Sequence, residues 1–239
     1  MRRTITRMPT AELDLLLHDA ELAHGHLCAG QILGVRMAVL ACRLLNIHDP
    51  RSKQSPDRKR LVTFVEIDRC ATDAIAVVTG CRVGKRALKL RDWGKMAATF
   101  LDLARPIDPD EVNGQPDHFR ALRLVALESS KERARELFPT NVDGSPFTDK
   151  NQQQMRAYRD LPDADLFGAQ WVSVHLPPSE FPGFRGARVT CSVCGEGINF
   201  DRFALTPGTG DATGEALCRG CADLANRYYQ PLPDPPPAL

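Results

Sequence analysis

The stretch His24-Gly25-His26-Leu27-Cys28-Ala29-Gly30 interrupts the helical pattern near the start of the chain and separates two predicted helices. Apolar residues recur at helical spacing in 9–23 and again in 31–46, so a helix is predicted on each side of the interruption. Imidazole and thiolate groups gathered in one tight turn suit zinc, iron, nickel or copper. Cys28 would also have its thiolate stabilised by the dipole of the second helix. The turn is therefore interpreted either as a metal or thiol site or as a polar turn with a buried thiol.

A second cluster of the same residue types follows a predicted strand, residues 61–67. Cys70 and Asp73 lie at the start of a short predicted helix, which Thr72 is expected to cap and Gly80 to end. The run Gly80-x-x-x-Gly84-Lys85 is one residue shorter than a phosphate-binding loop, and it lacks the Ser or Thr that holds magnesium. We expect the two clusters to meet in an open second metal site. Its candidate ligands are His24, His26, Cys28, Cys70 and Cys81, and the candidate catalytic residues are Cys28, Asp73 and Lys85.

Two Cys-x-x-Cys pairs near the end of the chain carry the most specific motif. They supply four thiolates, the tetrahedral set that structural zinc prefers, and Gly195 can adopt the left-handed backbone that the first knuckle needs. A segment of about 40 residues can hardly form a stable core without a bound metal ion or another cross-link. Unrelated thiols or two redox pairs are the alternatives. The prediction is a closed structural zinc site formed by Cys191, Cys194, Cys218 and Cys221.

The remaining patterns place the chain in the α+β class, with a mixed helix and sheet N-terminal domain and a small zinc-binding domain built on the four C-terminal cysteines. A hairpin turn at Asp92-Trp93-Gly94 is expected to join two short strands, and Cys42 is expected in the core because it lies on an apolar helical stripe. The further predicted elements are strands 87–91 and 95–103, helices 118–137 and 150–159, and strand 167–176. The predicted domains are 1–180 and 186–230, joined by linker 177–185 and followed by a disordered proline-rich tail, 231–239.

Composition and charge limit the partners and the cellular location that can be expected for this protein. The chain has 239 residues, and its 31 Lys and Arg residues against 30 Asp and Glu residues leave a net charge of +1. This balance gives no global electrostatic case for binding nucleic acid. No stretch predicts a membrane span or a secretory signal, so a cytoplasmic location is expected. In a reducing compartment, the 8 cysteines indicate metal ligands or redox groups more readily than disulfides.

The two N-terminal motifs resemble those of the FmdE family of formylmethanofuran dehydrogenase subunits. The run 24–30 followed by Gly34-Val35-Arg36 is similar to the opening motif, and 70–85 is similar to the second motif. The resemblance covers residues 18–105 and extends more weakly to 176. Ala29 stands where the family usually has proline, and Arg82 where it usually has threonine. Some members are similar in carrying a C-terminal zinc-binding module.

The resemblance implies an α+β core, a His/Cys site that can hold a metal, and homodimers. The family takes its name from a molybdenum or tungsten complex that reduces carbon dioxide onto methanofuran. The expected function is therefore that of a metal-binding accessory subunit or enzyme in one-carbon or molybdenum and tungsten redox metabolism. Redox-enzyme partner subunits, a small-molecule ligand and a second zinc or other transition metal are part of this expectation. Whether the chain catalyses a reaction by itself stays open.

Two other functions fit the residues. A zinc-ribbon adaptor or regulator would bind protein or nucleic acid, but acidic residues offset the arginines around the ribbon, so nucleic acid is not expected. A thiol-redox protein would use Cys28, Cys70 or Cys81, but no Cys-x-x-Cys pair occurs in the N-terminal part.

Overall fold

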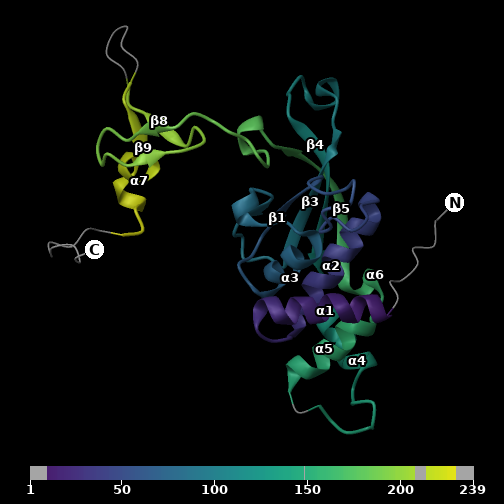
Figure 1. The fold of residues 1–239 in the computed structure, drawn as a ribbon. Helices are drawn as coiled ribbons and strands as arrows, with labels where there is room; N and C mark the ends of the chain where they lie inside the picture. Colours follow the sequence, from purple (N-terminus) through teal and green to yellow (C-terminus); the bar gives the residue numbers. More distant parts are fainter. Residues whose placement is uncertain (1–9, 148, 208–213, 230–239) are drawn as a thin grey trace. The chain divides into compact units, whose positions relative to one another are not determined.

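The computed structural model describes residues 10–147, 149–207 and 214–229 and divides the chain into two compact units. The N-terminal unit is Met1–Pro182 and the C-terminal unit is Gly183–Leu239 (Figure 1). The predicted linker 177–185 spans this boundary. The predicted proline-rich tail, 231–239, lies outside the described residues.

A five-stranded sheet in the order β2-β1-β3-β4-β5 forms the frame of the N-terminal unit. β1 and β2 run parallel, whereas the other neighbouring strands are antiparallel. The strands are β1 (Leu61–Val65), β2 (Leu88–Leu90), β3 (Ala97–Pro106), β4 (His118–Ala126) and β5 (Phe167–His175).

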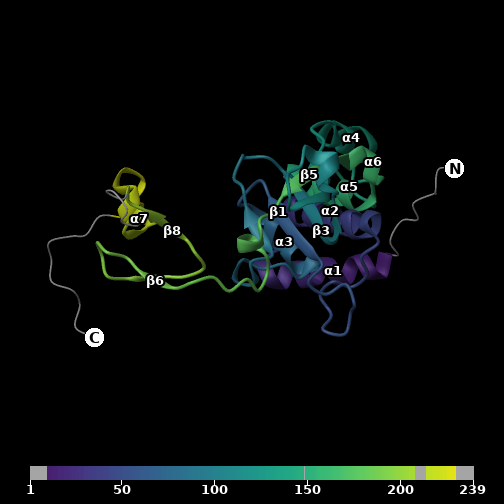
Figure 2. The ribbon, with the colours of Figure 1, turned by 90° about the horizontal axis from the view of Figure 1, so that it is seen from above.

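Helices pack against one face of this sheet (Figure 2). Phe100 and Leu122 from the sheet share a buried cluster with Ile32 from α2. The opposite face buries a smaller cluster around Leu101 and Phe119. The helices are α1 (Thr10–His24), α2 (Ala29–Leu45), α3 (Cys70–Thr79), α4 (Ser129–Leu137), α5 (Lys150–Asp160) and α6 (Asp163–Leu166), and they confirm the α+β class. Within the described residues, no helix is both long and apolar enough to cross a membrane.

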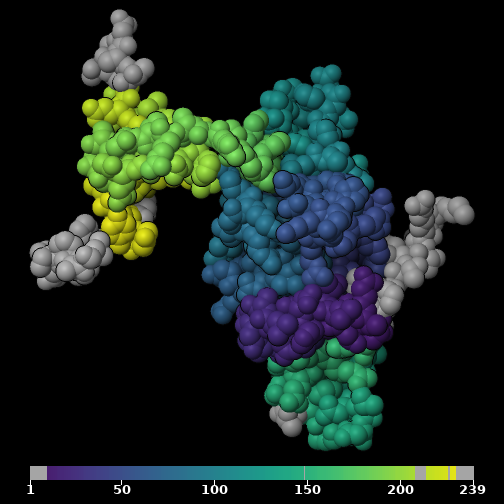
Figure 3. Space-filling view, in the orientation of Figure 1, coloured from purple at the N-terminus to yellow at the C-terminus, as the bar shows by residue number. Residues whose placement is uncertain are grey.

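α2 is the central helix, and it is buried nearly all round because most of its residues are apolar. Its buried Arg36 donates hydrogen bonds to the backbone carbonyls of Tyr158 and Leu161 and pairs with Asp163, which fixes the end of α5. Cys42 is buried on the same helix, as its place on the apolar stripe predicts. By contrast, α1 stays at the surface, where its outer face is exposed (Figure 3).

The predicted helix 118–137 is wrong in its first half. Residues 118–126 form strand β4, and α4 begins only at Ser129. Phe119 belongs to one face of the sheet and Leu122 and Leu124 to the other. Since both faces of β4 are covered, its apolar residues do not alternate cleanly, and their spacing imitates a helix.

The predicted hairpin at Asp92-Trp93-Gly94 is also wrong. β2 pairs in parallel with β1, and β1 lies between β2 and β3. The turn instead crosses the end of β1, where the backbone N–H groups of Trp93 and Lys95 donate to the carbonyl of Glu66. β1, α3 and β2 thus form a crossover unit, which local turn chemistry does not reveal.

The start of α3 differs from the prediction in its cap. Arg69 occupies the capping position and offers no side-chain cap, while Thr72 lies inside the first turn. The Thr72 hydroxyl donates to the carbonyl of Ile67 at 2.6 Å and so closes the junction between strand and helix. Gly80 ends α3 with a left-handed φ of 69°, as predicted.

The C-terminal unit consists of very short elements around two turns. β6 (Val189–Thr190) pairs with β7 (Gly197–Ile198), and β8 (Phe203–Leu205) pairs with β9 (Ala216–Cys218). α7 (Arg219–Ala222) follows β9 directly, and a turn of 3₁₀ helix, Leu224–Asn226, comes after it. Among the described residues of this unit, Cys191 and Ile198 are the buried hydrophobic ones. Such a core is far too small to hold the unit by itself.

Candidate metal sites

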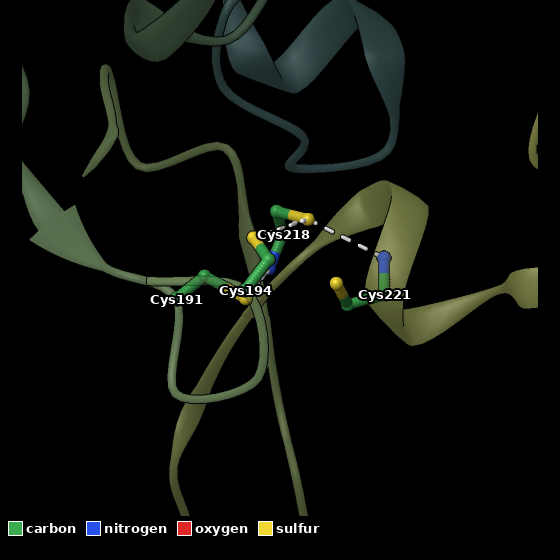
Figure 4. Close-up of side chains that lie close together, drawn as sticks. All are labelled: Cys191, Cys194, Cys218 and Cys221. Atoms are coloured by element: carbon green, nitrogen blue, oxygen red, sulfur yellow. Dashed lines mark hydrogen bonds between the residues drawn. The ribbon is translucent and has the colours of Figure 1, made fainter. Parts of the chain in front are cut away.

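The four C-terminal cysteines gather at one point. Cys191 and Cys194 lie on the turn after β6, and Cys218 and Cys221 lie where β9 passes into α7 (Figure 4). Their sulfur atoms all lie within 4.8 Å of one another, and the Sγ atoms of Cys194 and Cys218 are 4.0 Å apart. Sulfurs bound tetrahedrally at about 2.3 Å from one ion stand about 3.8 Å from each other. The cluster therefore fits a tetrahedral metal ion.

Backbone N–H groups shape this cluster. The amide of Cys218 donates to the Cys191 sulfur and the amide of Cys221 donates to the Cys218 sulfur, both at 3.3 Å. Gly195 has the left-handed φ of 74° that the first turn requires. The N–H groups of Cys194 and Cys218 lower the pKa of Cys191 to about 6. The thiol of Cys218 and burial raise the pKa of Cys221 to about 12.

The two pKa shifts have different main causes. Backbone N–H groups stabilise a thiolate at Cys191, whereas the contact with the Cys218 thiol and burial oppose ionisation of Cys221, and repulsion by the Cys191 thiolate adds to this. A cation at the centre would remove the repulsion and allow all the thiols to ionise, so metal binding would release protons. Arg227 adds positive charge at the edge of the site, where its Nη2 donates to the Cys221 sulfur at 3.7 Å.

The predicted second site lies where α2 and α3 begin. Cys28 is the capping residue of α2, in extended conformation, and Cys70 is the first residue of α3. A Cβ placed on Gly30 would lie 3.7 Å from the Cys28 sulfur and 3.3 Å from the Cys70 Cβ. Cys28 and Cys70 are therefore neighbours, although helix α2, a loop and strand β1 separate them in the sequence. Both are partly exposed.

His24 is the last residue of α1, and His26 lies on the turn between α1 and α2. Gly25, with φ of 95°, reverses the chain directly after α1. His24 Nδ1 lies 2.8 Å from the carboxylate of Asp73 in the first turn of α3, and the rings of His24 and His26 are 4.8 Å apart at their centroids. This hydrogen bond holds the His24 ring at Nδ1 and leaves its Nε2 available to a ligand.

Burial and the adjacent Cys28 thiol hold the pKa of Cys70 above its ordinary value. Each would oppose a thiolate at Cys70 when no cation is present. The His24, His26, Cys28 and Cys70 side chains are brought together pairwise rather than as one closed cluster. In the part of the chain that the structure describes, the four C-terminal cysteines alone place three or more ligand atoms within 4.8 Å of one another.

Cys81 and Lys85 lie elsewhere. Cys81 follows the far end of α3, where it is buried and its thiol donates to the carbonyl of Leu61. Lys85 is exposed at the same end, with Nζ 3.4 Å from the carbonyl oxygen of Gly80. α3 rises about 1.5 Å per residue, so its ten residues separate Cys70 from this end by about 15 Å. The structure thus does not bring Cys81 or Lys85 to the start of α2.

Two further residues at this site were not predicted from the sequence. The Asn151 side-chain oxygen accepts a hydrogen bond from the Ala29 amide at 3.1 Å and so caps α2 from α5. No local pattern could reveal this contact. Gln31 is fully buried, and its Nε2 donates to the Cys70 carbonyl at 2.6 Å, while its Oε1 has no hydrogen-bond partner in the described chain. A glutamine inside an apolar helix was a signal that could have found it.

Comparison with known proteins places these features in a family context. A family model described as "FmdE, Molybdenum formylmethanofuran dehydrogenase operon" matches residues 23–168. The chain is 37% identical over 94 residues to a probable S-adenosyl-L-methionine-binding protein of Archaeoglobus fulgidus. That match covers 39% of this chain and 25% of the relative, so the chain spans about a quarter of that protein's length.

A solved structure shares the fold. It is a tungsten formylmethanofuran dehydrogenase FmdE-like protein from Syntrophus aciditrophicus, with a TM-score of 0.54 and 16% sequence identity. The match covers 92% of this chain and 98% of that chain.

Proposed function

Because the chain belongs to the FmdE family, we propose that it is a metal-binding accessory subunit or enzyme of one-carbon or molybdenum and tungsten redox metabolism. In this proposal, an open site at the starts of α2 and α3 binds a transition metal or a small-molecule ligand. The four C-terminal cysteines hold a structural zinc. The two sites have different roles, because a closed four-thiolate site leaves no coordination position for a substrate and can only stabilise the fold.

The observation that carries the open site is the meeting of the two N-terminal motifs. His24 is hydrogen-bonded to Asp73, and Cys28 lies beside Cys70, so each motif contributes to both contacts. Imidazole nitrogen and thiolate sulfur are donors that suit zinc and other late transition metals. Asp73 stands in the position of the carboxylate that commonly orients a metal-bound imidazole.

The residues divide the work as follows. His24, His26, Cys28 and Cys70 would hold the ion, which when bound supplies a Lewis acid or redox centre. Asp73 is 56% exposed at its side chain and keeps His24 in one tautomer. A site that binds a substrate would use three of these four ligands and leave the fourth position of a tetrahedral ion to water or the substrate.

A small-molecule ligand is suggested by one finding. The Archaeoglobus fulgidus relative, of which this chain matches 25%, is named for S-adenosyl-L-methionine. S-adenosyl-L-methionine is therefore the first small molecule to test at this site.

Metal analysis of anaerobically purified protein tests the proposal. The wild-type chain should hold metal at both sites. Cys28→Ser should lose the N-terminal metal and keep one zinc, because it removes a thiolate from the N-terminal site and leaves the four C-terminal cysteines intact. Cys218→Ser should lose the ribbon zinc and keep the N-terminal metal. Element-resolved mass spectrometry of each protein gives the content per chain.

The matched control is Cys42→Ser, which removes a buried thiol of the same helix at some distance from the site. Its metal content should equal that of the wild type. The open metal site is refuted if Cys28→Ser retains the full wild-type metal content while its circular dichroism shows the native fold.

A further inference from the structure

We propose that Cys28 and Cys70 form a dithiol that a low-molecular-weight disulfide oxidises reversibly to an intramolecular disulfide. We also propose that this bond empties the open site by consuming two of its ligands. The second statement rests on the proposed function, because it requires the site to bind metal. The first statement rests only on the geometry of the thiols.

The two side chains both lie beside Gly30, so they are neighbours in space. The point that a Cβ of Gly30 would occupy lies 3.7 Å from the Cys28 sulfur and 3.3 Å from the Cys70 Cβ. A disulfide requires Cβ atoms about 3.5–4.5 Å apart and a sulfur–sulfur bond of about 2.0 Å. Rotation about each Cα–Cβ bond moves the sulfur atoms, while the packing of the start of α2 against the start of α3 sets how far apart the two Cβ atoms lie. The influence of the Cys28 thiol on the pKa of Cys70 also shows that they are neighbours.

The packing of α2 against α3 holds the two thiols next to each other. A Cβ on Gly34 would lie 2.5 Å from the Ala71 carbonyl oxygen, so α2 and α3 pack at backbone distance near their starts. Gln31 adds a hydrogen bond from α2 to the Cys70 carbonyl. The fold therefore achieves through tertiary contact the thiol pairing that a Cys-x-x-Cys motif achieves locally.

The reaction proceeds in two exchange steps with an oxidised disulfide, RS–SR. One protein thiolate attacks RS–SR, which forms a mixed disulfide and releases RS⁻. The second thiolate then attacks the protein sulfur of the mixed disulfide, which forms the Cys28–Cys70 bond and releases a second RS⁻. Two electrons pass from the protein to RS–SR, and the two protons lost by the protein thiols go to solvent or to the thiols released. Excess RSH reverses both steps.

Accessibility separates this pair from the other thiols. Cys28 and Cys70 are partly exposed, so a small oxidant reaches them. Cys42 and Cys81 are also close enough to affect each other, but they are 8% and 2% exposed. Burial, and then the nearby Cys81, raise the pKa of Cys42 to about 12, which keeps it a thiol. This buried pair is an internal control for proximity without access.

Redox titration of the full-length protein tests the first statement. The protein is equilibrated in buffers of reduced and oxidised glutathione, the free thiols are alkylated, and the peptides are identified by mass spectrometry. The expected product is a peptide pair linked through Cys28 and Cys70 that disappears in reduced glutathione. Cys28→Ser and Cys70→Ser should abolish it, and Cys42→Ser should leave it unchanged.

The outcome that overturns the proposal is equally specific. In oxidised glutathione, Cys28 and Cys70 would remain free or carry glutathione without ever forming the cross-link. Folding of each variant is checked by circular dichroism, and Cys28→Ala and Cys70→Ala provide a second pair of variants if a serine variant fails to fold.

Cobalt(II), added as an optical probe, tests the second statement. The reduced protein should bind Co²⁺ at the N-terminal site and the oxidised protein should not. Reduced protein that has first been loaded with Co²⁺ should form the disulfide more slowly, in proportion to the fraction of sites occupied. If the reduced protein binds no Co²⁺ there, the proposed function fails while the disulfide stands. If Co²⁺ binds equally before and after oxidation, the switch is refuted.

Discussion

Gly34 is the residue on which the second site depends most. A Cβ at this position would lie 2.5 Å from the Ala71 carbonyl oxygen and 2.8 Å from the Ala74 Cβ. A glycine inside a helix is unfavourable by about 0.5–1 kcal/mol relative to alanine, but here it permits two helices to pack at backbone distance. This contact places Cys28 beside Cys70 and lets Asp73 reach His24.

Substitution of this glycine gives a prediction at the residue scale. Gly34→Ala should lower the free energy of unfolding by about 1–3 kcal/mol, since the helices must move apart to admit the methyl group. Gly84→Ala is the matched control, because a Cβ there meets no atom within 4 Å, and its effect should stay within about 0.5 kcal/mol. Urea unfolding measures both. Equal stability of the two variants would contradict the packing argument.

At the scale of elements, the two units are held together by different physics. The N-terminal sheet buries apolar clusters on both faces. The strands of the C-terminal unit contain two or three residues each and bury almost nothing among its described residues. The turn after β6 and the junction of β9 with α7 instead bring four cysteines to one point. A metal ion bound to the four cysteines would therefore supply most of the folding free energy of this unit.

Removal of the metal should unfold the C-terminal unit and leave the N-terminal unit folded. A chelator should unfold the described residues of this unit from 188 to 229, because the proposed ion would be their core, while the sheet of the N-terminal unit stays folded. Hydrogen exchange followed by mass spectrometry should show fast exchange in that segment and unchanged protection in β1, β3 and β4. Cys218→Ser should behave like the chelated protein without any chelator. Protection of 188–229 that survives complete metal removal would rule out this role for the ion.

At the scale of the whole molecule, homodimerisation stays a prediction from the family resemblance. The chain has a mass of 26.4 kDa, so a dimer is easily distinguished from a monomer by sedimentation equilibrium. We expect a single species of twice the chain mass that dissociates only on dilution. The measurement is made on reduced protein, so that a cross-link between chains cannot imitate assembly. A measured mass equal to that of one chain at every concentration would contradict the dimer.

The sequence by itself determined what depends on neighbours along the chain. Two Cys-x-x-Cys pairs predicted the four-cysteine cluster because each pair forms its own turn around shared sulfur ligands. Helical periodicity located α1, α2 and α5, and the glycine after α3 correctly marked its end. The α+β class followed from these local patterns together with the strands at 61–67 and 167–176.

Only the tertiary structure decided what depends on distant contacts. Both faces of β4 are covered in the folded chain, so its sequence lacks the alternation of apolar and polar residues that is typical of a strand. The strand order, with β1 between β2 and β3, also depends on contacts between distant parts of the chain. The tertiary structure also brought Cys70 to Cys28 and moved Cys81 away, although both cysteines flank the same short helix. The reason is that the length of a helix separates its two ends in space, and which end meets a partner is set by long-range packing, here the contact of Gly34 with Ala71.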